Sequence, residues 1–231
     1  MKNILIVLVV FTFLFSCTSD KKGSMLVTGE VKNLKKGTLY LQKIKDTVLV
    51  TVDSIALDGV STYTLSDDIE SPELYFLSLD KSPSKQISFF GEKGTITINT
   101  KLDKFVFAAS IKGLSNQLLL DEYNEMIDKF NGKNLDLIKA EFETNKVGDS
   151  IRYDSISKAR KNLLKSRYLY TTNFAVNHAD KEVAPYLALT ELPNANITLL
   201  DTIHKSLSTE VSASKYGKKL NDFLAEIKAN E

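Results

Sequence analysis

Serine, histidine and aspartate could together supply a hydrolase site in this sequence. The tripeptide Asp-Ser-Ile begins at Asp53, Asp149 and Asp154, and Ser54 could act as a nucleophile with His178 as its base. Such a site is defined by geometry rather than by sequence order, and the chain has no Gly-x-Ser-x-Gly elbow. A strand position for Ser54 and a helix cap at Asp149 are simpler interpretations. We therefore predict no catalytic residues and no enzyme.

Carboxylates and histidines could instead bind a metal ion. Asp67, Asp68 and Glu70 lie close together, but calcium loops place carboxylates at alternate positions around a glycine turn. His178 and His204 are far apart and fall outside any His-x-x-x-His pattern. A solvated acidic turn is the favoured interpretation, and no metal or other cofactor is predicted.

Two further patterns could bind a ligand. The segment Gly91–Gly94 has too few glycines for a phosphate loop or dinucleotide fingerprint, so it predicts a hairpin turn. A group of aromatic side chains could form a binding surface, but the chain has no tryptophan and core packing is the simpler explanation. These aromatic residues are Tyr63, Tyr75, Phe76, Phe89 and Phe90.

Cys17 is the only cysteine. One cysteine excludes an intramolecular disulfide, a Cys-x-x-Cys pair and a multi-cysteine metal site. The apolar run from Ile4 to Phe15 is interrupted only by Thr12, and it is shorter than the ~20 residues that span a bilayer. Its length and the preceding Lys2 are typical of a secretory signal.

The segment from Leu14 to Cys17 resembles the lipobox of bacterial lipoprotein precursors. The resemblance implies cleavage between Ser16 and Cys17, diacylation of the Cys17 thiol and acylation of the new amino group. Two or more acyl chains anchor a protein stably to a membrane. A buried core cysteine, or a signal cleaved further along, is the alternative.

The charge composition limits the classes of partner that the chain is expected to bind. The chain has 231 residues with 30 Lys+Arg and 29 Asp+Glu, so it carries no general attraction for nucleic acid. The membrane, through the lipid anchor, is one expected partner, and an envelope protein is another. No run of acidic residues follows Cys17, which favours the periplasmic face of the outer membrane.

The hydrophobic pattern predicts an α+β chain. We expect a signal peptide at residues 1–16, a lipidated tether at 17–24, an antiparallel β-sandwich-like domain at 25–112 and a helical region at 113–231. Short connections favour antiparallel neighbours. The expected strands are Met25–Lys32, Gly37–Lys43, Thr47–Leu57, Ser61–Leu65, Leu74–Leu79, Gln86–Phe90, Thr95–Asn99 and Phe105–Lys112.

Helical spacing of apolar residues begins after Gly113. Ser115 is a candidate cap for a first helix that Gly132 would end, and Asp149 or Ser150 would cap a long helix to about Asn177. Further helices are expected near residues 184–192 and 199–207, and a last one is capped by Ser214.

Several motifs, in this order, resemble one known module. They are Gly29-Glu-Val, Gly37-Thr-Leu-Tyr-Leu, Asp53-Ser-Ile, Pro72-Glu-Leu-Tyr and Phe89-Phe-Gly-Glu-Lys-Gly-Thr-Ile. The module is the uncharacterised N-terminal domain of Gram-negative envelope thiol–disulfide interchange (thioredoxin-like) lipoproteins. Residues up to Glu231 contain no Cys-x-x-Cys, so the redox activity of that family is not expected here.

We therefore predict a lipid-anchored envelope protein that acts as a non-enzymatic binding or scaffold module. One alternative is an accessory to a separate periplasmic thiol–disulfide oxidoreductase. Another is a lipoprotein that captures a small ligand or a glycan.

Overall fold

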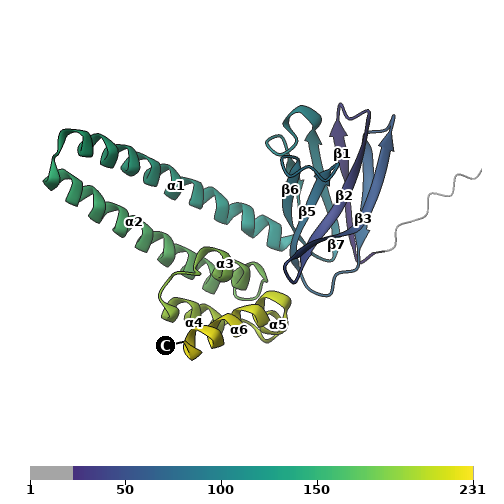
Figure 1. Cartoon of the computed structure of the whole chain (residues 1–231). Coiled ribbons are helices and arrows are strands. Elements are labelled where there is room, and N and C mark those ends of the chain that lie inside the picture. The colour runs from purple at the N-terminus through teal and green to yellow at the C-terminus, as the bar shows by residue number, and fades with distance from the viewer. Residues whose placement is uncertain (1–22, 231) are drawn as a thin grey trace, which may run out of the picture.

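The computed structural model describes residues 23–230, which form a β-sandwich followed by six helices (Figure 1). One sheet has the strand order β4-β1-β7-β8 and the other has the order β3-β2-β5-β6. The α+β layout expected from the sequence is confirmed. The strands are β1 (Met25–Lys32), β2 (Lys36–Lys45), β3 (Val48–Asp58), β4 (Thr62–Asp67), β5 (Glu73–Leu79), β6 (Gln86–Gly91), β7 (Gly94–Lys101) and β8 (Ser110–Lys112).

The strand pairing departs from the expected antiparallel pattern at one place. β1 and β7 pair in parallel, with Val27 opposite Ile96. Short connections were expected to join neighbours in one sheet, but those after β1, β3, β4 and β6 carry the chain from one sheet to the other. The segment Gly91–Gly94 is therefore an inter-sheet connection, and its prediction as a hairpin turn was wrong.

A charged network also joins the two sheets. The Lys43 ammonium on β2 lies 2.6 Å from the Asp67 carboxylate on β4, and the Tyr75 hydroxyl on β5 donates to the same carboxylate at 2.6 Å. Burial of the ring, and then the neighbouring Asp67 carboxylate, raise the pKa of Tyr75. The phenol therefore keeps its proton and serves as a donor at neutral pH.

The last expected strand, Phe105–Lys112, is mostly not a strand. A 3-10 helix at Leu102–Lys104 leads into a helical turn, in which the Ala108 N–H donates to the Lys104 carbonyl at 2.8 Å. The Thr100 hydroxyl donates to the Phe105 carbonyl at 2.6 Å, and the Phe105 side chain is buried. Burial of Phe105 under the sandwich therefore holds this segment in a turn, and only residues 110–112 pair as a strand.

Two long helices form an antiparallel hairpin that projects away from the sandwich, while the shorter helices pack at its base (Figure 1). The helices are α1 (Ser115–Val147), α2 (Ser150–Asn177), α3 (Val183–Glu191), α4 (Ile197–Ser206), α5 (Thr209–Ala213) and α6 (Lys215–Ala229). Asp149 caps α2 and Ser214 caps α6, as expected from the sequence.

Gly132 does not end the first helix, which was a wrong prediction. The helix continues to Val147, and the chain turns at Gly148, whose φ is 68°. A glycine inside an exposed helix costs only about 1 kcal/mol relative to alanine, so packing along the α1–α2 hairpin outweighs it. We call residues 131–163 the distal hairpin; in this span only Thr144 and Ile156 are buried.

The sandwich and the helices share one hydrophobic cluster. Phe90 of β6 is fully buried, and its ring lies 5.5 Å from that of Tyr186 and 6.1 Å from that of Tyr216.

Ser115 was expected to cap α1, but the cap position is Leu114, which makes no side-chain cap. Glu92 supplies the acceptors instead, taking hydrogen bonds from the Asn116 N–H at 2.9 Å and the Ser115 hydroxyl at 3.2 Å.

Within residues 23–230, none of the helices combines the length and the apolar character that crossing a bilayer requires.

Candidate functional site

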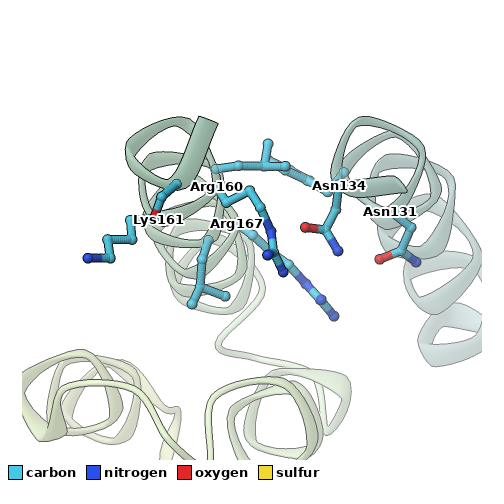
Figure 2. Close-up of a pocket in the computed structure, with 9 residues that line it drawn as sticks. Asn131, Asn134, Arg160, Lys161 and Arg167 are labelled. Atoms are coloured by element: carbon cyan, nitrogen blue, oxygen red, sulfur yellow. The ribbon is translucent and has the colours of Figure 1, made fainter. Parts of the chain in front are cut away.

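A pocket of about 380 Å³ lies between α1 and α2, near the point where the distal hairpin leaves the rest of the molecule. Its size falls in the range of small-ligand sites, which is about 300–1,000 Å³. In Figure 2, Arg160 and Arg167 extend from α2 into the space beside α1, toward the side that carries Asn131 and Asn134. The lining residues are Phe130, Asn131, Asn134, Ser157, Arg160, Lys161, Leu163, Leu164 and Arg167.

Each arginine is held by a carboxylate from a different helix. Arg160 donates from Nη1 to Glu141 of α1, and Arg167 donates from Nη2 to Glu191 of α3, both at 2.5 Å. The side chains of both arginines are about one third exposed, at 38% and 31%. The ion pairs therefore fix the two guanidinium groups while part of each stays accessible from the pocket.

The Nε–H groups of Arg160 and Arg167 are buried and have no acceptor. A buried donor without a partner costs about 1–3 kcal/mol. The edge formed by Nε and one Nη is the edge of arginine that binds a carboxylate or phosphate through two parallel hydrogen bonds. An oxyanion that met this edge after a small side-chain rotation would satisfy a donor that the folded chain leaves unpaired.

Aromatic packing supports Phe130, one of the residues that line the pocket. The Phe130 ring lies 5.9 Å from the ring of Tyr170, which stacks 5.9 Å from Tyr123. The Tyr123 hydroxyl forms a 2.7 Å hydrogen bond with the Thr171 hydroxyl, and burial raises the pKa of Tyr123. This row joins α1 to α2 next to Phe130, so the helix spacing beside the pocket is fixed by a packed core.

The pocket is positively charged. Three cationic side chains line it: Arg160, Lys161 and Arg167. Glu141 and Glu191 pair with the two arginines, which leaves one positive charge in excess. Asn131, Asn134 and Ser157 add neutral hydrogen-bonding groups, and Phe130, Leu163 and Leu164 add apolar surface. This combination suits a ligand that carries a single oxyanion and some apolar surface.

Sequence reasoning missed these residues, although the composition contains a signal. Of the 30 basic residues only three are arginines, and Arg152, Arg160 and Arg167 all lie on α2. Arg160 and Arg167 are seven positions apart, which places them on one helix face. Arginine is preferred over lysine where planar, two-point oxyanion recognition is needed.

A second hollow, of about 620 Å³, lies at the junction of the sandwich with the helices. Several of its charged and polar groups are paired with one another or with a neighbouring strand. Glu92 and Glu182 accept hydrogen bonds from Asn116, Asp180 pairs with Lys181 at 2.9 Å, and Lys215 pairs with Glu73 of β5. We therefore interpret this hollow as a structural joint between the two parts of the molecule.

The hydrolase alternative finds no geometric support. Ser54 lies on β3, the edge strand opposite β6, and β6 is the strand that contacts α1. His178 is the residue that ends α2, and its ring packs 4.6 Å from that of Phe174. Asp149 caps α2 by accepting the Arg152 N–H at 3.0 Å. The structure thus places Ser54 and His178 in different parts of the molecule.

The acidic turn and the aromatic cluster have structural roles. Asp67 pairs with Lys43, and Asp68 accepts the Ser24 N–H at 3.0 Å. Between residues 23 and 230, no three His, Cys, Asp or Glu side chains gather closely enough to hold a metal ion. Of the five aromatic residues considered from the sequence, Phe76 is half-buried and the others are buried in the hydrophobic core: Tyr63, Tyr75, Phe89 and Phe90.

The predicted lipidation site cannot be compared with the structure. Ser16 and Cys17, like the rest of the expected signal peptide, lie outside the described residues.

The comparison with known families concerns mainly the sandwich. Residues 25–120 match a domain of unknown function, DUF4369. The DUF4369 region contains all eight strands and the first turns of α1, and it ends before the pocket residues of the hairpin. No curated protein and no solved structure matches the chain.

Proposed function

We propose that this protein is a lipid-anchored bacterial envelope protein that binds the anionic group of a ligand between α1 and α2 and catalyses no reaction. The anchor is Cys17, and the protein faces the periplasm from the outer membrane. The support for this location is the lipobox-like segment from Leu14 to Cys17 behind an apolar leader. We further propose that the DUF4369 region is the N-terminal module found in envelope thiol–disulfide interchange lipoproteins.

One structural observation gives the main support for the binding role. Two arginines are fixed by carboxylates on two other helices, and both keep an unpaired Nε–H beside a pocket of ligand size. The two ion pairs use only one Nη of each arginine, so they leave both Nε–H groups without an acceptor. A bound carboxylate or phosphate removes the cost of the unpaired donors, because charge-assisted hydrogen bonds are the stronger ones.

The test uses the lipid-free chain, residues 17–231 carrying Cys17→Ala. The three hydrophobic clusters of the described residues lie between Met25 and Ile227, so removing the leader leaves them intact. Heteronuclear NMR resolves the Nε–H signals of the arginines, and Arg152 on the same helix serves as an internal control. Acetate and inorganic phosphate at millimolar concentration are expected to shift the Arg160 and Arg167 signals but not the Arg152 signal.

Substitutions complete the test. Arg160→Lys keeps a charge to pair with Glu141 but lacks the Nε–Nη edge, so the anion-induced shift at Arg167 is expected to weaken. Arg152→Lys is the matched control and is expected to leave the response unchanged. If neither anion moves the Arg160 and Arg167 signals, the proposed binding role is wrong.

A further inference from the structure

A second groove adjoins the pocket between α1 and α2. This groove, of about 370 Å³, runs between α2 and α4 and shares Lys161 and Leu164 with the first pocket. Its other lining residues include Tyr168, Leu169 and Leu199, and its surface is mainly apolar. Leu164 is 48% exposed and lines both hollows, and Leu169 is 44% exposed and lines the groove alone.

The two hollows have complementary chemistry. The first presents two guanidinium groups and two amides. The second is lined by Lys165, Asn196 and Thr198 as well as by aliphatic and aromatic side chains, but the surface it exposes is mainly apolar. They meet at Leu164, so a ligand that fills both must change from polar to apolar along its length. Figure 2 shows the Lys161 side chain directed away from the two arginines.

We propose that the ligand is a single-chain amphiphile with one carboxylate or phosphate head and an unbranched aliphatic tail. This inference rests on the proposed anion-binding function. The head meets Arg160 and Arg167, and the tail crosses Leu164 into the groove along Tyr168, Leu169 and Leu199. The two guanidinium groups at the first pocket, each with an unpaired Nε–H, match the oxygens of one anionic head.

The experiment measures the affinity of acetate, hexanoate, octanoate and decanoate for the lipid-free chain by calorimetry, below the micelle concentration. Each methylene that becomes fully buried is expected to strengthen binding by up to about fourfold. This factor corresponds to about 0.8 kcal/mol per buried methylene, since about 1.4 kcal/mol changes an affinity tenfold. Decanol, with the same tail and no charge, is expected to bind at least about tenfold more weakly than decanoate.

Two matched pairs of variants locate the head and the tail. Arg160→Lys is expected to weaken every carboxylate in the series, whereas Arg152→Lys leaves them all unchanged. Leu169→Gln is expected to flatten the dependence on chain length while leaving acetate unchanged. Leu135→Gln is its control, because Leu135 is an exposed leucine of the same hairpin that lines neither hollow.

Several outcomes would overturn the proposal. If acetate shifts the arginine signals but decanoate binds no more tightly than acetate, the amphiphile is wrong while anion binding stands. Equal weakening by Leu135→Gln and Leu169→Gln would show non-specific adsorption. If the protein binds phosphatidylglycerol vesicles but not monomeric decanoate, the groove contacts a membrane surface and does not bind a single amphiphile. A ligand-free dimer that Leu169→Gln dissociates would assign it to a second copy of the chain.

Discussion

The side-chain carbonyl of Asn116, at the start of α1, accepts a hydrogen bond from the backbone N–H of Val183, at the start of α3, at 2.9 Å. Its amide group donates to Glu182 at 3.0 Å and to Glu92 of the sandwich at 3.3 Å. One buried side chain therefore connects the sandwich, the hairpin and the helices at its base. Because the pocket lies farther along the same hairpin, Asn116 contributes to the orientation of the pocket relative to the sandwich.

Asn116→Ala is expected to destabilise the protein by about 1–3 kcal/mol, because it leaves the Val183 N–H buried without an acceptor. Chemical denaturation of the lipid-free chain measures this change. Asn124→Ala is the matched control on the same helix; Asn124 is exposed, and alanine is the better helix former there. Equal effects of the two substitutions would contradict the role assigned to Asn116.

Two glycines of the hairpin are expected to respond in opposite directions to alanine. Gly132 lies inside α1 with no atom within 4 Å of an added Cβ, so Gly132→Ala stabilises the helix by about 1 kcal/mol. Gly148 has equally open space but a φ of 68°, so Gly148→Ala introduces a left-handed alanine that costs about 1–2 kcal/mol.

Amide hydrogen exchange in the distal hairpin is the appropriate measurement for both glycine variants. Only Thr144 and Ile156 are buried there, so this span can open without unfolding the rest of the protein. Protection is expected to rise in Gly132→Ala and to fall in Gly148→Ala. A shift in the same direction for both would mean that backbone conformation does not control the stability of the hairpin.

The sequence predicted the strands well because their alternation and turn residues are local signals. It failed where distant contacts decide the structure. The parallel pairing of β1 with β7 depends on a crossover between sheets, and the passage of α1 through Gly132 depends on packing against α2. The pocket was missed for the same reason, because Glu141 and Glu191 reach the arginines from positions 19 and 24 residues away. The restriction of all three arginines to one helix was the only sign of the pocket in the sequence.

Tyr75 is expected to make stability depend on pH in the alkaline range. The folded state raises the pKa of Tyr75 above the ordinary value of 10.0, so the native protein retains the phenolic proton that the unfolded chain loses. The contribution of Tyr75 is fully present below pH 10.0 and decreases as the pH rises above that value. Denaturation of the wild type and of Tyr75→Phe between neutral pH and pH 11 or so measures the difference.

At neutral pH, Tyr75→Phe is expected to lose about 1 kcal/mol, because the hydroxyl that donates to Asp67 is removed. The difference between the two proteins should narrow above pH 10.0, since the variant has no phenol to ionise at this position. A constant difference across the range would mean that Tyr75 ionises at the same pH in the folded and unfolded chains.

Lipid attachment at Cys17 can be tested separately from ligand binding. Cys17→Ala is expected to abolish incorporation of radiolabelled palmitate and to release the protein from the membrane fraction, because the proposed anchor attaches the diacyl group through a thioether to Cys17. Ser19→Ala, two residues further on, is the matched control and is expected to retain both the label and the membrane association. Since two or more acyl chains are needed for stable anchoring, partial release of Cys17→Ala would indicate a second membrane contact. Label that persists in Cys17→Ala would refute the proposed anchor.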